Sequence, residues 1–281
     1  MQLIVHGGAG GEPEEPGKRQ AVLDEAAAAG TNEETPIEAV VSAIEILETN
    51  PRFNAGIGGA LQSDGVVRTD AGMMTDDRQV GAACSMPGVC HAADVARLVM
   101  EDTPHILLAG NHAVSLAEEF GIETDVDLTT DRTRERWTEC NPPEETPERL
   151  DWVREQFSGS DTVGAVAVNE GAVAAATSTG GRWCALAGRV GDVPQVGSGF
   201  YASPAGGASA TGAGEDIARV TLSRLAVEYL EAGDSPQEAA ECAIEEFEEL
   251  TGSTAGIIVL DSEGRAGSAY NSAAMQTSGE F

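Results

Sequence analysis

A threonine stands at the start of an apolar strand in the stretch Ser160-Asp161-Thr162-Val163-Gly164-Ala165-Val166-Ala167-Val168. The residues before it, from about 125 to 160, are rich in Asp, Glu, Arg, Thr and Pro, which predicts a long mobile connector. Two interpretations are open at this point. Thr162 is a β-branched residue that simply begins a strand, or the chain cuts itself before Thr162.

Self-cleavage would give Thr162 two reactive groups. A threonine at a new N-terminus carries a hydroxyl and an α-amine, whose pKa of about 8 lets it act as general base for that hydroxyl. No histidine is then required, which suits a chain with only four histidines.

The sequence on both sides of this stretch predicts strands and helices in blocks. Strands are expected at Leu3–His6, Val66–Thr69, Val80–Met86, His105–Leu108, Val163–Val168, Ala172–Thr177, Ile257–Asp261 and Gly267–Asn271. Helices are expected at Lys18–Ala29, Pro36–Glu48 (capped by Thr35), Ala92–Met100, His112–Phe120, Pro147–Phe157, Asp216–Ala232 and Pro236–Leu250. Blocks of this kind favour antiparallel sheets packed against helices, an α+β fold, over a βα alternation.

The composition limits the partners of the chain. Its 281 residues include 47 acidic and 16 basic side chains, a net charge of −31, and Lys18 is the only lysine. Such a surface repels phosphate, so nucleic-acid binding is not expected. The composition predicts adaptation to molar salt, which screens self-repulsion; the alternative is an ordinary acidic cytoplasmic protein. No apolar run reaches a membrane-spanning length and the start has no basic leader, so neither a membrane span nor a signal peptide is expected.

Cysteine and histidine patterns argue against several kinds of site. Five cysteines at irregular spacing include no C-x-x-C pair, and the four histidines lack metal-ligand spacing. We therefore expect free thiols in a reducing cytoplasm, without a zinc site or a disulfide framework. No G-x-S-x-G serine-hydrolase motif is present.

A glycine-rich segment near the start invites a nucleotide-binding interpretation. His6-Gly7-Gly8-Ala9-Gly10-Gly11 follows an apolar strand, but Glu12-Pro13-Glu14-Glu15-Pro16 comes next. These residues would repel a pyrophosphate and break the helix that the motif requires. A tight turn beside a site is the preferred interpretation, and no organic cofactor is expected.

Four motifs together resemble a known family. They are Asp161-Thr162-Val163-Gly164-Ala165-Val166-Ala167, Ala174-Ala175-Ala176-Thr177-Ser178-Thr179-Gly180-Gly181, Gly188-Arg189-Val190-Gly191-Asp192 and Thr211-Gly212-Ala213-Gly214-Glu215. With Val5–Gly10 and Phe53–Gly58 upstream, the sequence resembles the plant-type L-asparaginase / isoaspartyl peptidase family of N-terminal-nucleophile hydrolases. The resemblance covers nearly the whole chain and implies a single domain, a four-layer αββα sandwich.

The resemblance implies a set of catalytic residues. Cleavage between Asp161 and Thr162 would give an α chain 1–161 and a β chain 162–281. Thr162 would be the nucleophile and its freed amine the base, with Thr179 orienting the hydroxyl. The Thr211 hydroxyl and the Gly212 amide would form the oxyanion hole.

The same resemblance implies a binding site for a free amino-acid head group. Arg189 would hold the substrate α-carboxylate and Asp192 its α-ammonium, with Gly214 beside the amine and Thr211 and Gly212 at the reacting carbonyl. L-Asparagine and β-aspartyl dipeptides are the implied substrates. Glycosylasparagine, or an internal aspartyl bond as in threonine aspartases, remains an alternative.

Two further expectations come from the resemblance. A loop at about Glu48–Ile57 would bind a sodium ion through backbone carbonyls, and two processed copies would associate as (αβ)₂. An unprocessed, inactive homologue that acts as a binding protein is the alternative of another class, and a nucleotide-binding protein is a third.

Overall fold

Two β-sheets form the centre of the fold. The computed structural model describes residues 1–143, 146–156 and 162–280. The larger sheet has the strand order β11-β1-β5-β6-β2-β3-β4, antiparallel except for the β3–β4 pair. Its strands are β1 (Gln2–Gly10), β2 (Arg68–Thr75), β3 (Val80–Pro87), β4 (Leu108–Ala109), β5 (Val163–Asn169), β6 (Ala172–Thr179) and β11 (Ala274–Glu280). The smaller sheet, in the order β10-β9-β8-β7, contains β7 (Phe200–Ser203), β8 (Gly206–Gly212), β9 (Ala255–Asp261) and β10 (Ala266–Tyr270).

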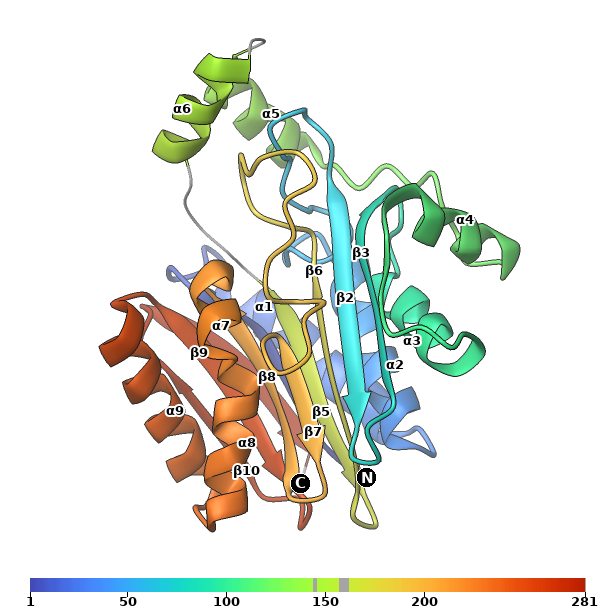
Figure 1. The fold of residues 1–281 in the computed structure, drawn as a ribbon, viewed down its shortest axis with the longest axis vertical. Helices are drawn as coiled ribbons and strands as arrows, with labels where there is room; N and C mark the ends of the chain where they lie inside the picture. Colours follow the sequence, from blue (N-terminus) through green and yellow to red (C-terminus); the bar gives the residue numbers. More distant parts are fainter. Residues whose placement is uncertain (144–145, 157–161, 281) are drawn as a thin grey trace.

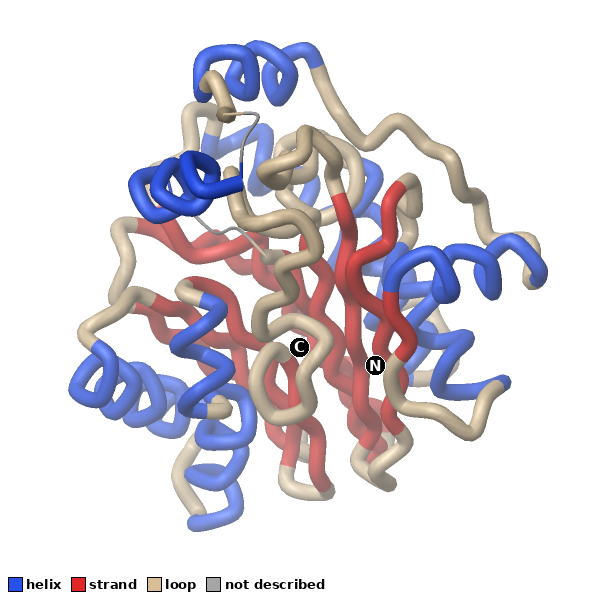
Figure 2. Tube along the Cα trace, turned by 45° about the horizontal axis from the view of Figure 1, so that its top comes forward, coloured by secondary structure: helices blue, strands red, loops and turns tan. Residues whose placement is uncertain are grey.

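Helices cover the outer face of each sheet (Figures 1 and 2). Those that pack on the larger sheet are α1 (Pro16–Thr31), α2 (Pro36–Thr49), α3 (Ala92–Asp102) and α4 (Gly110–Glu119). Those on the smaller sheet are α8 (Leu222–Ala232) and α9 (Pro236–Thr251), preceded by the short α7 (Gly214–Val220). The inner faces of the two sheets meet in a third apolar cluster that includes Val166, Phe200 and Ile258. The fold is therefore the expected α+β, four-layer αββα sandwich.

The sequence of strand β5 fits a strand that is buried on both faces. Val163, Ala165 and Ala167 point toward the helices of the larger sheet, whereas Val166 and Val168 point toward the smaller sheet. The side chains of a strand alternate between faces, so a strand covered on both sides contains few polar residues. Thr162 immediately precedes β5, so the burial of this strand fixes the position of Thr162 relative to the two sheets.

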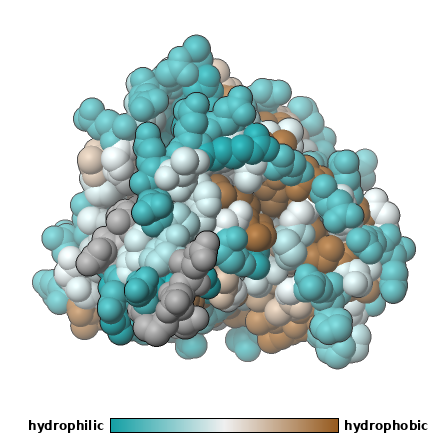
Figure 3. Space-filling model, turned by 90° about the horizontal axis from the view of Figure 1, so that it is seen from above, coloured by the Kyte–Doolittle hydropathy of each residue, from teal (hydrophilic) through white to brown (hydrophobic). Residues whose placement is uncertain are grey.

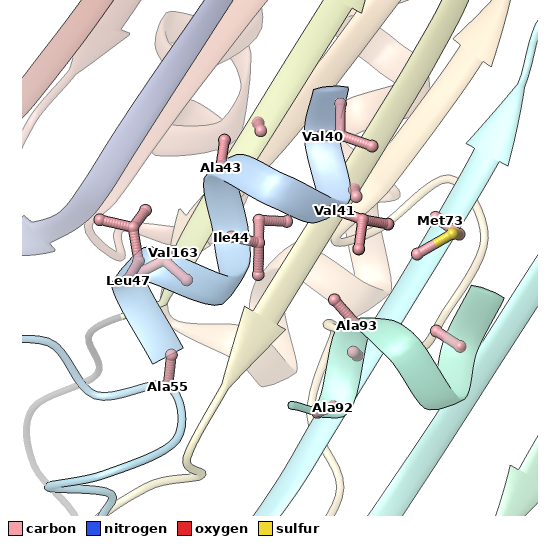
Figure 4. Packing of buried hydrophobic residues seen from close by; sticks show 14 of the residues in the cluster. Val40, Val41, Ala43, Ile44, Leu47, Ala55, Met73, Ala92, Ala93 and Val163 are labelled. Atoms are coloured by element: carbon pink, nitrogen blue, oxygen red, sulfur yellow. The ribbon is translucent and has the colours of Figure 1, made fainter. Parts of the chain in front are cut away.

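Helix α2 connects the larger sheet to the expected sodium loop. Thr35 caps its first turn in a capping box with Glu38, as predicted, and Pro36 occupies the first turn. Figure 4 shows Val40, Val41, Ile44 and Leu47 on the buried face of this helix, beside Val163. The helix ends at Thr49, so the loop starts from a well-anchored turn.

The expected connector at about 125–160 contains two helices in its described part. Helix α6 (Thr146–Gln156) matches the predicted one, and α5 (Asp131–Cys140) was not predicted. The mean hydropathy of α5 is low, which hides its periodicity, but Thr130 and Thr133 form a capping box at its start. Figure 1 places both helices above the strand ends, over the loop that follows β6.

Several predicted elements have wrong bounds. The strand expected at Val66–Thr69 is β2, which starts at Arg68 and runs to Thr75. The strand expected at His105–Leu108 is only the two-residue β4, since Ile106 and Leu107 lie exposed in a loop. The helix expected over Asp216–Ala232 is broken at Thr221, whose φ of 55° interrupts helical geometry.

Three strands were not predicted. β7 and β8 form a hairpin rich in Gly, Ala and Ser, whose small side chains give no hydrophobic alternation. β11 pairs with β1 at the edge of the larger sheet and has a mostly half-buried, polar sequence. Among the described residues, no helix is long and apolar enough to span a membrane.

Candidate active site

Thr162 and Thr179 are neighbours across two paired strands. Val163 of β5 pairs with Ser178 of β6, so the antiparallel register sets Thr162 opposite Thr179. Both threonines are buried. Thr179 in turn pairs with Asp70 of β2. Asp161, the other residue of the expected cleavage site, lies outside the described residues.

Asn54 anchors the end of β6 beneath these threonines. Its carbonyl accepts hydrogen bonds from the Gly180 amide (2.9 Å) and the Thr179 hydroxyl (3.4 Å). Its side-chain Nδ2 donates to the Gly181 carbonyl at 2.6 Å, and its Oδ1 accepts from the Ala60 amide at 2.9 Å. The Gly181 amide donates to the Thr179 hydroxyl at 3.2 Å. The Phe53–Gly58 segment therefore fixes the position of Thr179.

Thr211 and Gly212 end strand β8 in the smaller sheet. The fully buried Thr211 hydroxyl accepts a hydrogen bond from the Ala9 amide at 3.3 Å, which joins it to the glycine-rich end of β1. Gly212 has a φ of 137°, and a Cβ there would lie 2.5 Å from the Thr254 carbonyl. Only glycine fits this position, and its conformation turns the backbone from β8 toward α7.

Arg189, Asp192 and Gly214 meet at the start of α7. A Cβ on Gly214 would lie 2.4 Å from Asp192 Oδ1 and 2.9 Å from Arg189 Nη2. Arg189 donates to both carboxylate oxygens of Glu215 at 2.8 Å each, and Arg182 donates to Glu215 at 3.0 Å. The structure thus brings together the three residues expected to recognise a head group, two residues beyond Gly212.

The two carboxyl groups beside Arg189 differ in their pKa. Burial raises the pKa of Asp192 to about 6, although the Arg189 charge opposes the shift. Burial alone would also raise the pKa of Glu215, but the hydrogen bonds and charge of Arg189 hold it below its usual value. Asp192 Oδ2 is buried and has no hydrogen-bond partner among the described residues. A buried carboxylate oxygen without a donor is suited to an incoming cation.

Asp70 is a site residue that sequence reasoning missed. It is almost fully buried on β2, and its Oδ1 accepts from the Ser85 amide at 2.6 Å. Burial raises its pKa to about 7, with Arg189 lowering it and Asp192 raising it further. Its charge thus couples the Thr179 strand to the head-group residues. Asp70 precedes the small and apolar residues Ala71 to Met74 but follows Arg68 and Thr69, so no local signal in the sequence marks it as buried.

His6 belongs to a buried polar row behind Thr162. Its Nε2 lies 3.0 Å from the Ser209 hydroxyl, which is 2.7 Å from the Thr177 hydroxyl. Burial lowers the pKa of His6 to about 3, although the backbone carbonyl of Thr162 partly opposes the shift. His6 is therefore a neutral group at pH 7, and its Nδ1 has no hydrogen-bond partner among the described residues.

In the expected sodium loop at Glu48–Ile57, Gly56 lies close to the Glu48 carbonyl and to the Cys90 carbonyl from outside the loop. A Cβ on Gly56 would lie 2.5 Å from the Glu48 carbonyl and 2.7 Å from the Cys90 carbonyl. The Glu48 carbonyl accepts from the Ile57 amide at 2.8 Å and from the Cys90 thiol at 3.6 Å. Carbonyl oxygens are hard donors, which fit Na⁺ better than a transition metal.

The Glu48 side chain lies under the same loop. Its Oε1 accepts from the Ser178 hydroxyl (2.5 Å) and the Ala93 amide (3.1 Å). Burial raises its pKa to about 8, against these hydrogen bonds. Like Asp70, this buried acid was not singled out as a side chain from the sequence.

A cavity of about 330 Å³ opens on the other side of Asn54. Arg52, Arg132, Arg136 and Trp183 are among its lining residues, with Glu14 as the one acidic residue. Hydrophilic side chains cover much of the upper face, with hydrophobic groups gathered on one side (Figure 3). Three arginines around one cavity are notable in a chain with 16 basic residues.

Comparison with known proteins adds independent information. The family model Asparaginase_2, described as "Asparaginase", matches residues 1–279. The chain belongs to this asparaginase family. It is 38% identical to the isoaspartyl peptidase/L-asparaginase of Danio rerio over 284 residues, 97% of this chain and 90% of that protein. Plant-type L-asparaginases are similar as well: that of Pyrococcus abyssi is 39% identical (96% of this chain, 93% of that protein), and that of Pyrobaculum calidifontis 40% (97% and 94%).

Membership of the asparaginase family agrees with the αββα sandwich, and it makes the chain a hydrolase by family. The match also extends across both the upstream motifs and the part that begins at Thr162. All four motifs that suggested the family thus lie inside the matched region.

Proposed function

We propose that the chain is an autoprocessing threonine amidohydrolase that cleaves the side-chain amide of L-asparagine and of β-aspartyl dipeptides. The observation that carries the proposal is the meeting of Arg189, Asp192 and Gly214 two residues beyond Gly212. A guanidinium beside a buried carboxylate, one oxygen of which has no hydrogen-bond partner among the described residues, suits the α-carboxylate and α-ammonium of a free amino acid. The names of the similar proteins support the same substrates.

The first proposed reaction is self-cleavage. The Thr162 hydroxyl attacks the carbonyl of Asp161, and the acyl group moves from the Thr162 nitrogen to its oxygen. This shift breaks the Asp161–Thr162 amide bond, and the hydroxyl proton ends on the freed Thr162 amine. Water then hydrolyses the ester, which releases the Asp161 carboxylate and restores the Thr162 hydroxyl. The result is an α chain 1–161 and a β chain 162–281. The buried position of Thr162 opposite Thr179 supports this role for the hydroxyl.

The second proposed reaction is turnover. The freed amine takes the proton of the Thr162 hydroxyl as it attacks the side-chain amide carbonyl. The Thr211 hydroxyl and the Gly212 amide stabilise the oxyanion. The protonated amine of Thr162 gives its proton to the leaving ammonia or amine. Water then hydrolyses the β-aspartyl ester on Thr162.

Arg189 can bind a substrate while it remains paired with Glu215. Its contacts to Glu215 use Nε and Nη2, and a guanidinium has five N–H donors. Donors therefore remain for a second carboxylate. Glu215 holds the guanidinium in place, which reduces the entropy lost on binding.

The arginine-lined cavity beside Asn54 favours dipeptides among the possible substrates. The leaving group of a β-aspartyl dipeptide is an amino acid with a free carboxylate, whereas asparagine releases ammonia. Arg132 and Arg136 can attract that carboxylate.

We expect Arg136→Gln to lower kcat/KM for β-aspartyl dipeptides and to leave asparagine hydrolysis unchanged. The matched control is Arg224→Gln, which removes an exposed ion pair on α8. Equal effects on both substrates would contradict this part of the proposal.

Three accompanying features belong to the proposal. A sodium ion would be held by carbonyls of the Glu48–Ile57 loop and would supply only structural support there. Two processed copies would form an (αβ)₂ dimer, and the enzyme would act in the cytoplasm without an organic cofactor. Size measurement in molar salt, with Na⁺ exchanged for choline, tests the first two together.

Substrate comparison tests the function itself. The processed protein should hydrolyse L-asparagine and β-aspartyl dipeptides, with the released product measured directly. A preference for glycosylasparagine would support the alternative substrate class instead. An uncut chain without turnover of any of these substrates would favour the inactive, binding-protein alternative.

A further inference from the structure

Cys140 and Cys184 bring two thiols together from distant parts of the sequence. Cys140 is the last residue of α5, and Cys184 lies in the loop after β6, five residues before Arg189. Their Sγ atoms are 3.6 Å apart. Under the proposed cleavage before Thr162, the two cysteines belong to different chains. The contact therefore joins the α chain to the loop that carries Arg182 and Arg189.

The surrounding packing holds the two thiols in place. The rings of Trp137 and Trp152 meet edge to face with centroids 6.0 Å apart, and Trp152 Nε1 donates to the Cys140 carbonyl at 3.0 Å. The Arg136 guanidinium lies over the ring of Trp183, 4.2 Å from its centroid. All three tryptophans of the chain thus lie at this contact.

The backbone of Cys184 is fixed as well. Its amide donates to the Leu61 carbonyl at 3.0 Å, and it adopts a φ of 57°. The Cys184 segment is therefore held in place, and the close approach of the two sulfur atoms does not depend on free movement of both segments. Formation of a disulfide would shorten the 3.6 Å between the two sulfur atoms to about 2.05 Å.

The other cysteines provide a contrast. Cys84 and Cys90 are buried, and Cys242 lies half-buried on α9. Within the described ranges, none of these three is hydrogen-bonded to another thiol; Cys90 Sγ instead lies 3.6 Å from the Glu48 carbonyl. The chain thus contains one thiol pair and three internal controls.

We propose that Cys140 and Cys184 form a disulfide when a small disulfide oxidant such as oxidised glutathione is present. The bond fastens α5 to the loop that carries Arg182 and Arg189. It joins the α and β chains covalently after cleavage, a consequence that rests on the proposed processing.

The reaction is two successive thiol–disulfide exchanges. The Cys140 thiolate attacks one sulfur of oxidised glutathione, forms a mixed disulfide and releases one glutathione thiolate. The Cys184 thiolate then attacks the Cys140 sulfur and releases the second. The protons of the two cysteines end on the two released glutathiones. Two cysteines are oxidised and one glutathione disulfide is reduced.

The order of the two steps follows from the environments of the two thiols. Cys140 is half-buried, so the oxidant can reach it. Burial, together with the neighbouring Cys140, raises the pKa of Cys184 to about 12, although Arg136 favours its thiolate. Cys184 is therefore seldom a thiolate near pH 7, and it needs to react only with a sulfur already in contact with it.

Intact mass without reducing agent tests the proposal. The protein is treated with oxidised glutathione in molar salt, quenched with acid and measured before and after dithiothreitol. We expect one species that contains both chains and is lighter than their sum by two hydrogens. Dithiothreitol should separate it into the two chains. Peptide mapping should find Cys140 joined to Cys184.

Matched variants identify the cysteines involved. Cys140→Ser and Cys184→Ser should each lose the joined species, whereas Cys242→Ser should retain it. Under reducing conditions all three should hydrolyse asparagine as the unchanged protein does, which confirms folding. A stable glutathione adduct on Cys140, a disulfide through another cysteine, or a joined species in Cys140→Ser would overturn the proposal.

The same measurement separates this inference from the proposed processing. If the chain stays uncut, the disulfide still removes two hydrogens and still joins the same two peptides. If the cut chains are never joined after treatment with the oxidant, the proposed processing stands and the proposed disulfide is contradicted.

Discussion

The strand ends that carry the threonines and the loop at residues 180–199 hold their functional groups in different ways. Thr162, Thr179 and Thr211 are positioned by strand register and by backbone hydrogen bonds in two packed sheets. Arg189 is instead held by its ion pair with Glu215, and the ionisation of Asp192 depends on its burial and on the Arg189 charge. The comparison suggests that the reacting atoms depend on the fold, whereas recognition of the head group depends on ionisation.

Loss of Thr162 should have the largest effect. Thr162→Ala removes the hydroxyl that both proposed reactions require, so the chain should remain whole and turnover should fall by at least about 10⁴-fold. The measurement is intact mass together with release of ammonia from asparagine. Thr162→Ser keeps a hydroxyl and should still be cut; normal turnover by Thr162→Ala would disprove the nucleophile.

Thr211→Val should have the next largest effect. It keeps the shape of the buried side chain but removes one oxyanion donor, which lowers kcat by about 10²–10³-fold with little change in KM. The Ala9 amide also loses its acceptor, so a thermal melt should accompany the kinetics. Thr211→Ser is the control and should retain most activity. A rise in KM alone would place Thr211 in binding and not in catalysis.

Asp192 should set an acidic limit to activity. It must be ionised to accept the substrate ammonium, and burial raises its pKa to about 6. Protonation of the Thr162 amine, whose ordinary pKa is about 8, already lowers the rate as the pH falls. We therefore expect kcat/KM to decline more steeply below about pH 6, while kcat lacks this second decline. Asp192→Asn should lower kcat/KM throughout and remove this limb of the profile. If Asp192→Asn keeps the same steeper decline of kcat/KM at low pH, that decline belongs to another group.

Glu48→Gln should give the smallest effect, on stability. The folded-state pKa of Glu48 is raised to about 8, so the native protein binds its proton more tightly than the unfolded chain. The resulting stability is fully present below the usual glutamate pKa and is lost as the pH rises through about 8. Glu48→Gln mimics the neutral acid and should flatten the decline of Tm between about pH 5 and pH 8. If the Tm of Glu48→Gln declines with pH as steeply as that of the unchanged protein, the assignment of this pH dependence to Glu48 is contradicted.

The parts of the fold with clear periodicity could be predicted from the sequence. β5 alternates large and small apolar residues, and the Thr35–Glu38 box marks the start of α2. The β7–β8 hairpin could not be predicted, because Gly, Ala and Ser bury well without an apolar pattern. β11 is an edge strand with polar residues, and its pairing with β1 depends on contacts across the whole chain.

The residues of the candidate site also differ in whether they could be predicted from the sequence. The motif residues Thr162, Thr179, Arg189, Asp192 and Thr211 stood out because their local sequence resembles a family. Asp70 and the Glu48 side chain did not, because nothing local distinguishes a buried acid within an apolar strand or helix from an exposed one. Their importance comes from burial by distant elements, which raises the pKa of both groups.

The most direct measurement is the intact mass of the purified, unchanged protein kept in molar salt under reducing conditions. The account predicts two chains, 1–161 and 162–281, with threonine at the start of the second. A single uncut chain in both low and high salt, without turnover of asparagine or β-aspartyl dipeptides, would contradict it.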